Sequence, residues 1–398
     1  MSIIDHIVAQ QVAPDMAAML ATRPHYFANT TTFLAPDILT EITAQIRAIE
    51  SVIKSSNYIS AVQSRDGLLE ASHPQRQTQG AFMGYDFHIT DEGPRLIEIN
   101  SNAGGGLIVD MIEQTIGSSN GKFAAAVVNM FIGEWVNTGR TGQPSTVAIV
   151  DTEPTEQYHY PDMLLAKHLL ETRGISVVIC DPSALQLAQG KLRHGDQIID
   201  LVYNRLTDFT LTEPANAVLA EAYISNAAVI TPAPHHHALY ADKRNLITLS
   251  DPMKLTDLGI SADDIKTLSA IPKTIAVTPD LADDLWARRK GLFFKPKDGF
   301  GSRGAFRGAK LTRRVWGEIL DGDYIAQDLI APPIRAVTVE GAQTALKFDV
   351  RVYSYDGAAM LYAARIYQGQ TTNLRTAGGG LSAVIPINAA APCGPNIC

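Results

Sequence analysis

The sequence has few cysteines, no excess of positive charge and no long apolar run. Its three cysteines, Cys180, Cys393 and Cys398, are too few for a disulfide scaffold, and the first residues lack the basic segment of a secretory signal. We therefore expect a reduced, cytoplasmic protein. A formal net charge of −8 argues against a nucleic-acid partner, because phosphate affinity depends on clustered lysine and arginine. The nearest candidate for a membrane span, residues 123–136, is interrupted by polar residues and is shorter than the roughly 18 residues that a bilayer requires, so we expect a soluble protein without a membrane partner.

What the sequence does contain is enough apolar material for sizeable cores. Hydrophobic residues make up 46% and charged residues 19% of the 398 positions, and at about 150 residues per domain the length predicts two or three domains. Apolar residues at three- and four-residue steps predict an amphipathic helix over 38–55. Strands are expected at 84–89 and 95–100, on either side of the turn residues 91–94, and a helix is expected at 107–116.

A new unit begins near Ser145, after a polar linker. A strand at 146–150, a helix at 162–173 and a strand at 176–180 form a βαβ pattern, which predicts a parallel sheet covered on both faces. Further elements are expected in this order: strands at 201–203 and 228–230, a helix at 242–249, a strand at 292–295, a helix at 313–320, a strand at 324–327, and strands at 347–354 and 358–366 that turn at Asp356-Gly357 as a hairpin.

A glycine-rich loop follows the strand that ends at Lys295. Gly299, Gly301 and Gly304 lie in the segment Lys-Pro-Lys-Asp-Gly-Phe-Gly-Ser-Arg-Gly, where backbone N–H groups can approach phosphate oxygens closely. The segment is neither a Walker A sequence nor a dinucleotide fingerprint. An ordinary glycine-rich turn explains it equally well.

Two oxygen-bearing residues alternate in Leu-Ile-Glu-Ile-Asn, residues 96–100. On a strand, Glu98 and Asn100 share a face, and such oxygen donors suit Mg²⁺ bound together with substrate phosphates. Asp86 is the expected third ligand if a three-residue turn places it opposite Asn100 and places His88 opposite Glu98. A half-exposed edge strand with solvated polar residues is the alternative.

These two segments belong to a series of blocks that resembles one family. The blocks are Lys-Pro-Lys-Asp-Gly-Phe-Gly-Ser-Arg-Gly-Ala-Phe-Arg (295–307), Ala-Gln-Asp-Leu-Ile (326–330), Asp-Val-Arg-Val-Tyr-Ser-Tyr-Asp-Gly (349–357), Ala-Ala-Arg-Ile-Tyr-Gln-Gly (363–369) and Asn-Leu-Arg-Thr-Ala-Gly-Gly-Gly (373–380). Their order and spacing resemble the ATP-grasp glutathione synthetases. The block with Glu98 and Asn100 comes first here, as in the circularly permuted eukaryotic members. The resemblance covers roughly residues 83–105 and 145–385.

The resemblance implies an α/β (α+β) ATP-grasp fold, circularly permuted, with a parallel βαβ substrate lobe, a lid lobe and a large lobe with an antiparallel sheet. The implied division is as follows: 1–140, N-terminal helices and metal-ligand strands of the large lobe; 145–237, the substrate-binding lobe; 238–330, the small or lid lobe; 331–390, the remainder of the large lobe; 391–398, a flexible tail.

The resemblance also implies a role for each matching residue, with ATP and two Mg²⁺ ions as cofactors. The implied metal ligands are Asp86, Glu98 and Asn100. The implied ATP-binding residues are Lys243, Lys295, Lys297, Gly299, Gly301, Ser302 and Gln327. Arg351 and Arg365 would act on the transferred phosphoryl group, and Arg205, Asn373 and Arg375 would bind substrate.

The implied activity is an ATP-dependent carboxylate–amine ligase that forms an amide or peptide bond through an acyl phosphate. Its partners would be small amino-acid or peptide substrates and, as in the family, a second copy of the chain. An ATP-grasp enzyme that acts on a non-peptide carboxylate, or that stops at phosphorylation, is one alternative. A non-catalytic two-lobed ligand-binding protein is another.

Overall fold

The computed structural model describes residues 2–28, 30–67, 73–299, 301, 303–339 and 341–387. Ser302, expected in the phosphate-covering loop, lies outside these ranges, and so do Cys393, Cys398 and the tail expected at 391–398. Cys180 is buried. Within the described ranges, no helix combines the length and the apolar character needed to cross a membrane.

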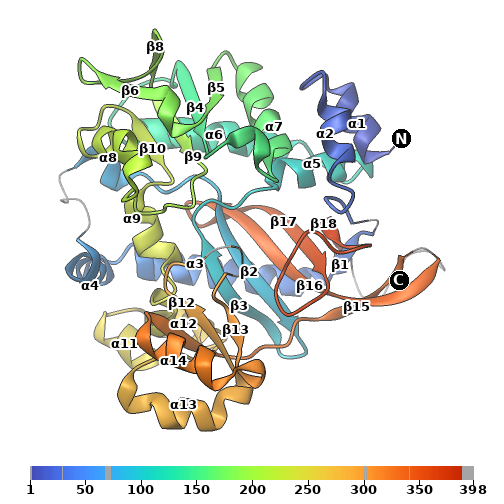
Figure 1. The fold of residues 1–398 in the computed structure, drawn as a ribbon, viewed down its shortest axis with the longest axis vertical. Helices are drawn as coiled ribbons and strands as arrows, with labels where there is room; N and C mark the ends of the chain where they lie inside the picture. Colours follow the sequence, from blue (N-terminus) through green and yellow to red (C-terminus); the bar gives the residue numbers. More distant parts are fainter. Residues whose placement is uncertain are drawn as a thin grey trace.

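One large sheet joins strands from both ends of the chain (Figure 1). Its order is β1-β18-β17-β16-β2-β3, and β15 pairs with β16 beyond this path. The strands are β1 (Thr32–Leu34), β2 (Met83–Thr90), β3 (Gly93–Asn100), β15 (Ile334–Val339), β16 (Ala342–Tyr355), β17 (Ala358–Tyr367) and β18 (Gly380–Pro386). Residues of the expected segments 1–140 and 331–390 therefore share one sheet.

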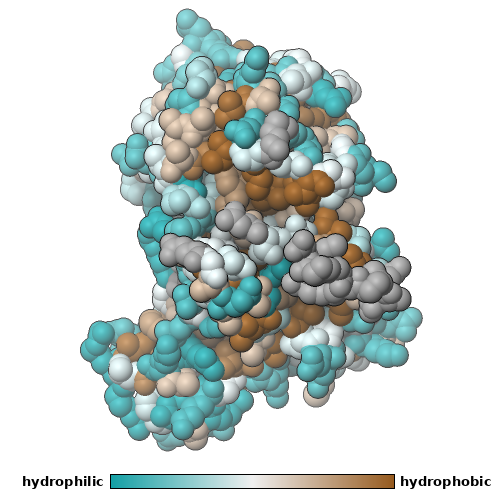
Figure 2. Space-filling view, turned by 90° about the vertical axis from the view of Figure 1, so that its right-hand side faces the viewer, coloured by the Kyte–Doolittle hydropathy of each residue, from teal (hydrophilic) through white to brown (hydrophobic). Residues whose placement is uncertain are grey.

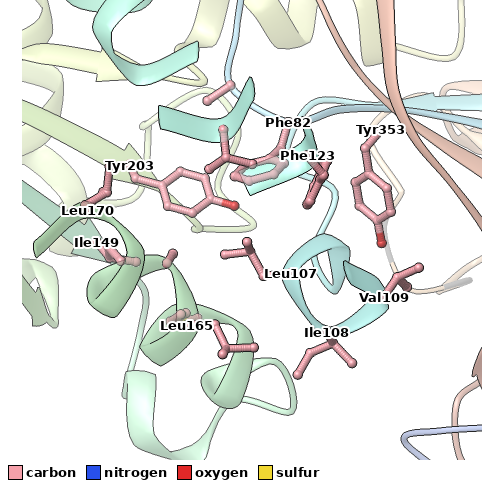
Figure 3. Packing of buried hydrophobic residues seen from close by; sticks show 14 of the residues in the cluster. Phe82, Leu107, Ile108, Val109, Phe123, Ile149, Leu165, Leu170, Tyr203 and Tyr353 are labelled. Atoms are coloured by element: carbon pink, nitrogen blue, oxygen red, sulfur yellow. The ribbon is translucent and has the colours of Figure 1, made fainter. Parts of the chain in front are cut away.

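The two faces of this sheet differ. Helix α3 (Pro36–Ile53) lies on the face formed by alternate residues such as Tyr85, Val350 and Ile366. The other face packs in part against α5 (Gly106–Thr115) and α6 (Lys122–Val136). Figure 3 shows this second core, in which Leu107 lies between Tyr203 and Tyr353. The second face also carries the charged residues of the candidate site.

The hairpin between β16 and β17 turns at Asp356-Gly357, as predicted. The φ angles of these two residues are 51° and 74°, the left-handed conformation that a two-residue hairpin turn requires. The expected helices at 38–55 and 107–116 correspond to α3 and α5, which start one or two residues earlier. Strong periodicity and turn chemistry therefore located these elements correctly.

The predicted parallel sheet is present, in the order β10-β9-β4-β5. Its strands are β4 (Thr146–Val150), β5 (Ser176–Cys180), β9 (Leu201–Asn204) and β10 (Val229–Thr231), with α7 (Tyr160–Glu171) and α8 (Ala217–Ile224) in the crossovers. A small meander between β5 and β9 was not predicted: β6 (Leu185–Ala188), β7 (Lys191–His194) and β8 (Gln197–Ile199). These strands are only three or four residues long, too short to show a clear apolar alternation in the sequence.

A third sheet has the order β11-β14-β12-β13. Its strands are β11 (Thr274–Ala276), β12 (Leu292–Pro296), β13 (Phe306–Arg307) and β14 (Tyr324–Asp328), covered by α13 (Ala282–Arg288) and α14 (Arg313–Asp321). The remaining helices are α1 (Ile3–Ala9), α2 (Met16–Ala21), α4 (Ser56–Asp66), α9 (Pro234–His236), α10 (Asn245–Leu249), α11 (Pro252–Asp257) and α12 (Ala262–Leu268). The third sheet and the helices that cover it form the lower lobe of the molecule in Figure 1. Figure 2 shows that this lobe is mainly hydrophilic, whereas hydrophobic residues gather higher on the same face.

The expected register of the β2–β3 hairpin is wrong. Thr90 pairs with Gly93 around a two-residue turn, so Asp86 lies opposite Glu98, and Gly84, not Asp86, lies opposite Asn100. His88 lies opposite Arg95 rather than Glu98. The register shifts between Asp86 and Phe87, because Ile97 forms a β-bulge that has no direct partner. This extra residue returns Asp86 and Glu98 to the same face of the sheet.

The contact between β18 and the N-terminal segment gives the first prediction. Gly380 has φ +123°, and an added Cβ would lie 2.7 Å from the backbone oxygen of His25. We expect Gly380→Ala to lower the free energy of unfolding by about 3 kcal/mol through backbone strain and overpacking. Gly317→Ala in α14 is the matched control, because nothing lies within 4 Å of the Cβ that it adds. This substitution should raise the free energy of unfolding by about 0.5–1 kcal/mol, because alanine favours a helix more than glycine does. Urea denaturation measures both, and equal effects would contradict this packing.

Candidate active site

Two cavities meet on the charged side of the large sheet. The first, of about 250 Å³, lies between that sheet and the β12–β14 lobe and is lined by Ile97, Phe293, Lys295 and Gln327 among others. The second, of about 270 Å³, extends toward the carboxyl end of β9 and is lined by polar residues that include Asn102 and Arg205. Both cavities are lined by Glu98, Lys243, Gly299, Gly301, Arg365 and Thr372. These shared residues form the junction of the two cavities.

A ladder of opposite charges crosses three strands, β2, β16 and β17, beside this junction. Asp86 is only 2% exposed, and its carboxylate accepts hydrogen bonds of 2.7 Å from Nε and Nη2 of Arg351 and from Nη2 of Arg365. Arg365 also donates through Nε to Asp349 at 2.7 Å. Burial by itself would raise the pKa of Asp86, but the charges of Arg351 and Arg365 outweigh burial and hold that pKa below its ordinary value. Asp86 is therefore ionised at neutral pH.

Asp86 differs in its surroundings from the metal ligand expected from the sequence. Both of its oxygens already accept from arginine, and Oδ2 also accepts from Nδ2 of Asn100 at 3.1 Å. Glu98, in contrast, lies at the junction and makes no hydrogen bond or ion pair with any described residue. Oδ1 of Asn100 accepts no hydrogen bond from any described residue. The oxygen atoms that remain free to bind a metal ion are therefore those of the Glu98 carboxylate and the Asn100 side-chain amide.

These donors fit a magnesium ion that shares its coordination with phosphate. Mg²⁺ is usually bound by one or two protein oxygens, with phosphate oxygens and water as its other ligands. Glu98 and Asn100 supply such a pair at the point where the cavities meet. Across the described residues, no group of three His, Cys, Asp or Glu side chains is arranged to hold a metal by itself. The chemistry of the donor set thus favours a metal that arrives with a phosphate ligand.

Two buried lysines approach the cavities from different elements. Lys295 lies on β12, is 4% exposed and donates to the backbone oxygen of Ile97 at 2.7 Å and to Oε1 of Gln327 at 2.8 Å. Burial lowers the pKa of Lys295 to about 8, although Glu98 opposes the shift. Lys243, 8% exposed, donates to the backbone oxygen of Gly299 at 2.5 Å.

Three of the expected site residues are not brought to either cavity. Lys297 pairs with Asp323 at 3.0 Å, because β12 ends at Pro296 and its alternation does not continue to Lys297. Asn373 is exposed and donates to the backbone oxygen of Gln368 at 2.8 Å, so it braces its own loop. Arg375 is exposed, and its guanidinium carbon lies 5.8 Å from the ring centre of Tyr158.

Three residues of the site were missed in the sequence. Asp349 stands two positions before Arg351 on β16, so strand alternation could have placed both on one face. His159 and His237 both line the second cavity. No local pattern marks His159, and the run His235-His236-His237 was interpreted as a proline-flanked loop leading into a helix rather than as a metal cluster. The ring of His237 stacks on Phe209 at 4.4 Å, and its Nδ1 is buried without a partner in the described part of the chain.

Comparison with known proteins identifies the fold. No family model matches the sequence, and no curated protein does. The chain is similar in structure to a glutathione synthetase-like effector from Globodera pallida, with 11% identity, 96% of this chain and 97% of that chain covered, and a TM-score of 0.53. It is also similar to a putative gamma-glutamylcysteine synthetase from Methylobacillus flagellatus, with 10% identity, 88% and 86% coverage and a TM-score of 0.48. The predicted ATP-grasp, glutathione synthetase-like fold is confirmed, whereas the circular permutation stays a prediction.

The charge ladder gives a prediction for acid stability. A carboxyl whose pKa is lowered by folding stabilises the protein above its unfolded pKa of about 3.9, and this contribution is lost as the pH falls toward the folded pKa. We expect Asp86→Asn to cost about 3 kcal/mol at neutral pH, because the buried guanidinium of Arg351 loses its carboxylate partner and that of Arg365 keeps only Asp349. Urea denaturation between pH 7 and pH 3 should show this cost narrowing below about pH 4.

The exposed Asp280 offers a control for this experiment, since Asp280→Asn removes a carboxylate from the surface. Its effect should be within about 0.5 kcal/mol at every pH. A cost of Asp86→Asn that stayed constant down to pH 3 would contradict the assignment of a lowered pKa to Asp86.

Proposed function

We propose that the protein is an ATP-dependent carboxylate–amine ligase that forms an amide or peptide bond through an acyl phosphate and releases ADP and phosphate. The observation that carries the proposal is the junction of the two cavities, where Glu98, Lys243 and Arg365 line both. A nucleotide in the first cavity and a carboxylate in the second would meet there. The fold supports the proposal as an analogy, since ATP-grasp folds hold such reactions.

The first cavity suits the nucleotide. Ile97, Phe293, Leu329 and Ile330 provide apolar walls for a planar base, and Gln327 lies among them. Lys295 reaches into the same space from β12, and Lys243 reaches the junction. The glycine loop passes over both cavities through Gly299 and Gly301. Lysines and backbone N–H groups are suited to hold the phosphates and to keep water away from them.

Glu98 and Asn100 would hold Mg²⁺ against the phosphates, and the ion would neutralise charge on the transferring group. Asp86 then has a different role from the one predicted: it aligns Arg351 and Arg365. Each of these arginines keeps Nη1 without a partner in the described part of the chain, beside the junction. Those N–H groups can stabilise the negative charge that spreads over the transferred phosphoryl oxygens.

The proposed reaction needs no nucleophile from the protein. A carboxylate oxygen of the substrate attacks the terminal phosphorus of ATP, the bond from that phosphorus to the bridging oxygen breaks, and ADP leaves. The amine nitrogen then attacks the carbonyl carbon of the acyl phosphate. The C–O bond to phosphate breaks, inorganic phosphate leaves, and the nitrogen loses a proton to solvent.

The two lysines provide a test of the nucleotide site. Replacing Lys295 or Lys243 by methionine removes a cation but keeps much of its bulk, and we expect the Kd for ATP to rise by about tenfold or more. Isothermal titration with Mg²⁺ and a non-hydrolysable ATP analogue measures the change. Lys297→Met should leave the Kd within about twofold, because Lys297 pairs with Asp323 outside both cavities. A larger loss from Lys297→Met than from Lys295→Met would contradict this placement of the nucleotide.

Release of ADP is the test of the activity itself. Amino acids and dipeptides are screened as acyl donors with a panel of amines, and products are identified by mass spectrometry. We expect ADP release to require both an acid and an amine, and Glu98→Gln to lower kcat by about two orders of magnitude through loss of charge at the metal position. ADP release from ATP and an acid alone, with a stable phosphorylated product, would instead favour a kinase-type reaction.

A further inference from the structure

A third cavity, of about 610 Å³, lies away from the candidate active site. Its walls come from the end of α3, from α4, from the short helical turn Pro74–Gln77 and from the segment that starts with α9. The helices α4 and α9 are at the left of Figure 1. This cavity shares no lining residue with the two cavities that meet at the junction, so a molecule bound in it would occupy a separate site.

One charge in the wall of the third cavity has no counterion. The charged side chains that line it are Lys54, Arg76 and Asp356, and Lys54 pairs with Asp356. The half-buried side chain of Arg76 makes no ion pair and no hydrogen bond with any described residue, and its Nη1 is enclosed without a partner. Burial lowers the pKa of Arg76, and no carboxylate of the described residues counteracts this. An anion in the cavity would therefore supply the partner that this guanidinium lacks.

The two histidines of the wall, His235 and His236, are neutral and already have partners. The backbone N–H of Ala233 donates to Nδ1 of His236 at 2.8 Å, so the ring hydrogen is on Nε2, which donates to Oγ1 of Thr78 at 3.1 Å. The hydroxyl of Tyr223 lies 2.6 Å from Nδ1 of His235, and Oγ1 of Thr78 lies 3.3 Å from its Nε2. Burial lowers the pKa of His236 to about 4 and also lowers that of His235. Neither ring offers a free nitrogen to a metal ion or a charge to an anion.

The rest of the wall combines neutral polar groups with apolar surface. Ser56 and Ser60 line the cavity from α4, and their hydroxyls make no hydrogen bond with any described residue. Ile59, Leu239 and Tyr240 supply apolar surface, and the hydroxyl of Tyr240 is occupied by a bond of 2.9 Å to the buried Glu50. A cavity with one free cation, a few hydroxyls and an apolar wall suits a small molecule that has an anionic end and an apolar part.

We propose that the third cavity binds a small organic anion, whose carboxylate or phosphate group pairs with Arg76 and whose apolar part packs against Leu239 and Tyr240. The planar guanidinium has no partner among the described residues, and its N–H groups suit either kind of anion. The site does not depend on the proposed function. His235, His236 and Tyr240 line the third cavity, whereas Lys243, three positions after Tyr240, lines the other two. The bound anion would therefore contact the segment that carries Lys243.

Binding of matched charged and neutral probes tests the proposal. The protein is mixed with Mg²⁺ and an excess of a non-hydrolysable ATP analogue, and it is then titrated by calorimetry with 2-naphthoate, 2-naphthyl phosphate and the neutral 2-naphthamide. We expect at least one of the two anions to bind with a Kd about tenfold or more below that of 2-naphthamide, and the tighter anion identifies the preferred group. Equal affinity for the three probes, or no binding of either anion, would overturn the proposal.

A pair of substitutions assigns the preference to Arg76. Arg76→Gln removes the cation and no ion pair within the described residues, so it should bring the Kd of the anion to within about twofold of that of 2-naphthamide. Arg47→Gln is the matched control, because Arg47 is exposed on α3 and does not line the cavity. It should leave the preference unchanged. Retention of the preference in Arg76→Gln, or its loss in Arg47→Gln as well, would overturn the proposal.

The histidine rings report where the anion binds. In protein labelled with ¹⁵N-histidine, the anion should shift the ring resonances of His235 and His236, because it offsets the positive charge of Arg76 beside them. His159 and His237, which line the second cavity, should not respond. Shifts confined to His159 and His237 would place the anion in the active site and overturn the proposal. The measurement requires no turnover, so its result stands whether or not the protein proves to be a ligase.

Discussion

The buried carboxylate of Asp86 is the interaction on which the charged face of the large sheet depends. A carboxylate that is 2% exposed is stable only when it is paired, and Arg351 and Arg365 pair with it through three hydrogen bonds of 2.7 Å. These arginines lie on β16 and β17, while Asp86 lies on β2, so the contact ties strands from the two ends of the chain. It also fixes the direction of the arginine nitrogens that remain open beside the junction of the cavities.

The bulge residue Ile97 joins the large sheet to the β12–β14 lobe through a hydrogen bond from Lys295. The bulge at Ile97 keeps Glu98 on the same face as Asp86, and the backbone oxygen of Ile97 accepts from Lys295 on β12. Lys295 therefore spans from one lobe to the other and lies between Ile97 and Gln327. A change in the position of the β12–β14 lobe would move this lysine relative to Glu98. The geometry of the junction consequently depends on how the two lobes are placed.

The sequence predicted the elements with strong local signals, but not those that depend on distant contacts. The apolar period of α3, the uniform strands of the parallel sheet and the Asp356-Gly357 turn are local properties, and all three were located correctly. Alternation also placed Glu98 and Asp86 on one face of the sheet, although the register was wrong because a bulge leaves no clear pattern in one sequence. Asp86 was expected to bind metal because its pairing partners, Arg351 and Arg365, lie more than 250 positions away and no local pattern indicates the pairing. The contact of Tyr26 with His159 was invisible for the same reason.

In the proposed mechanism, a carboxylate and ATP react directly at the junction of the two cavities. Transfer of ¹⁸O from a substrate carboxylate to inorganic phosphate tests it most directly. An acid labelled with ¹⁸O in both carboxylate oxygens is incubated with ATP, Mg²⁺ and the amine, and the released phosphate is analysed by mass spectrometry. Reaction through an acyl phosphate should leave one ¹⁸O atom in each phosphate, because the attacking carboxylate oxygen stays with phosphorus when the amine displaces the phosphate. Phosphate without ¹⁸O, released together with the amide product, would contradict a route through an acyl phosphate.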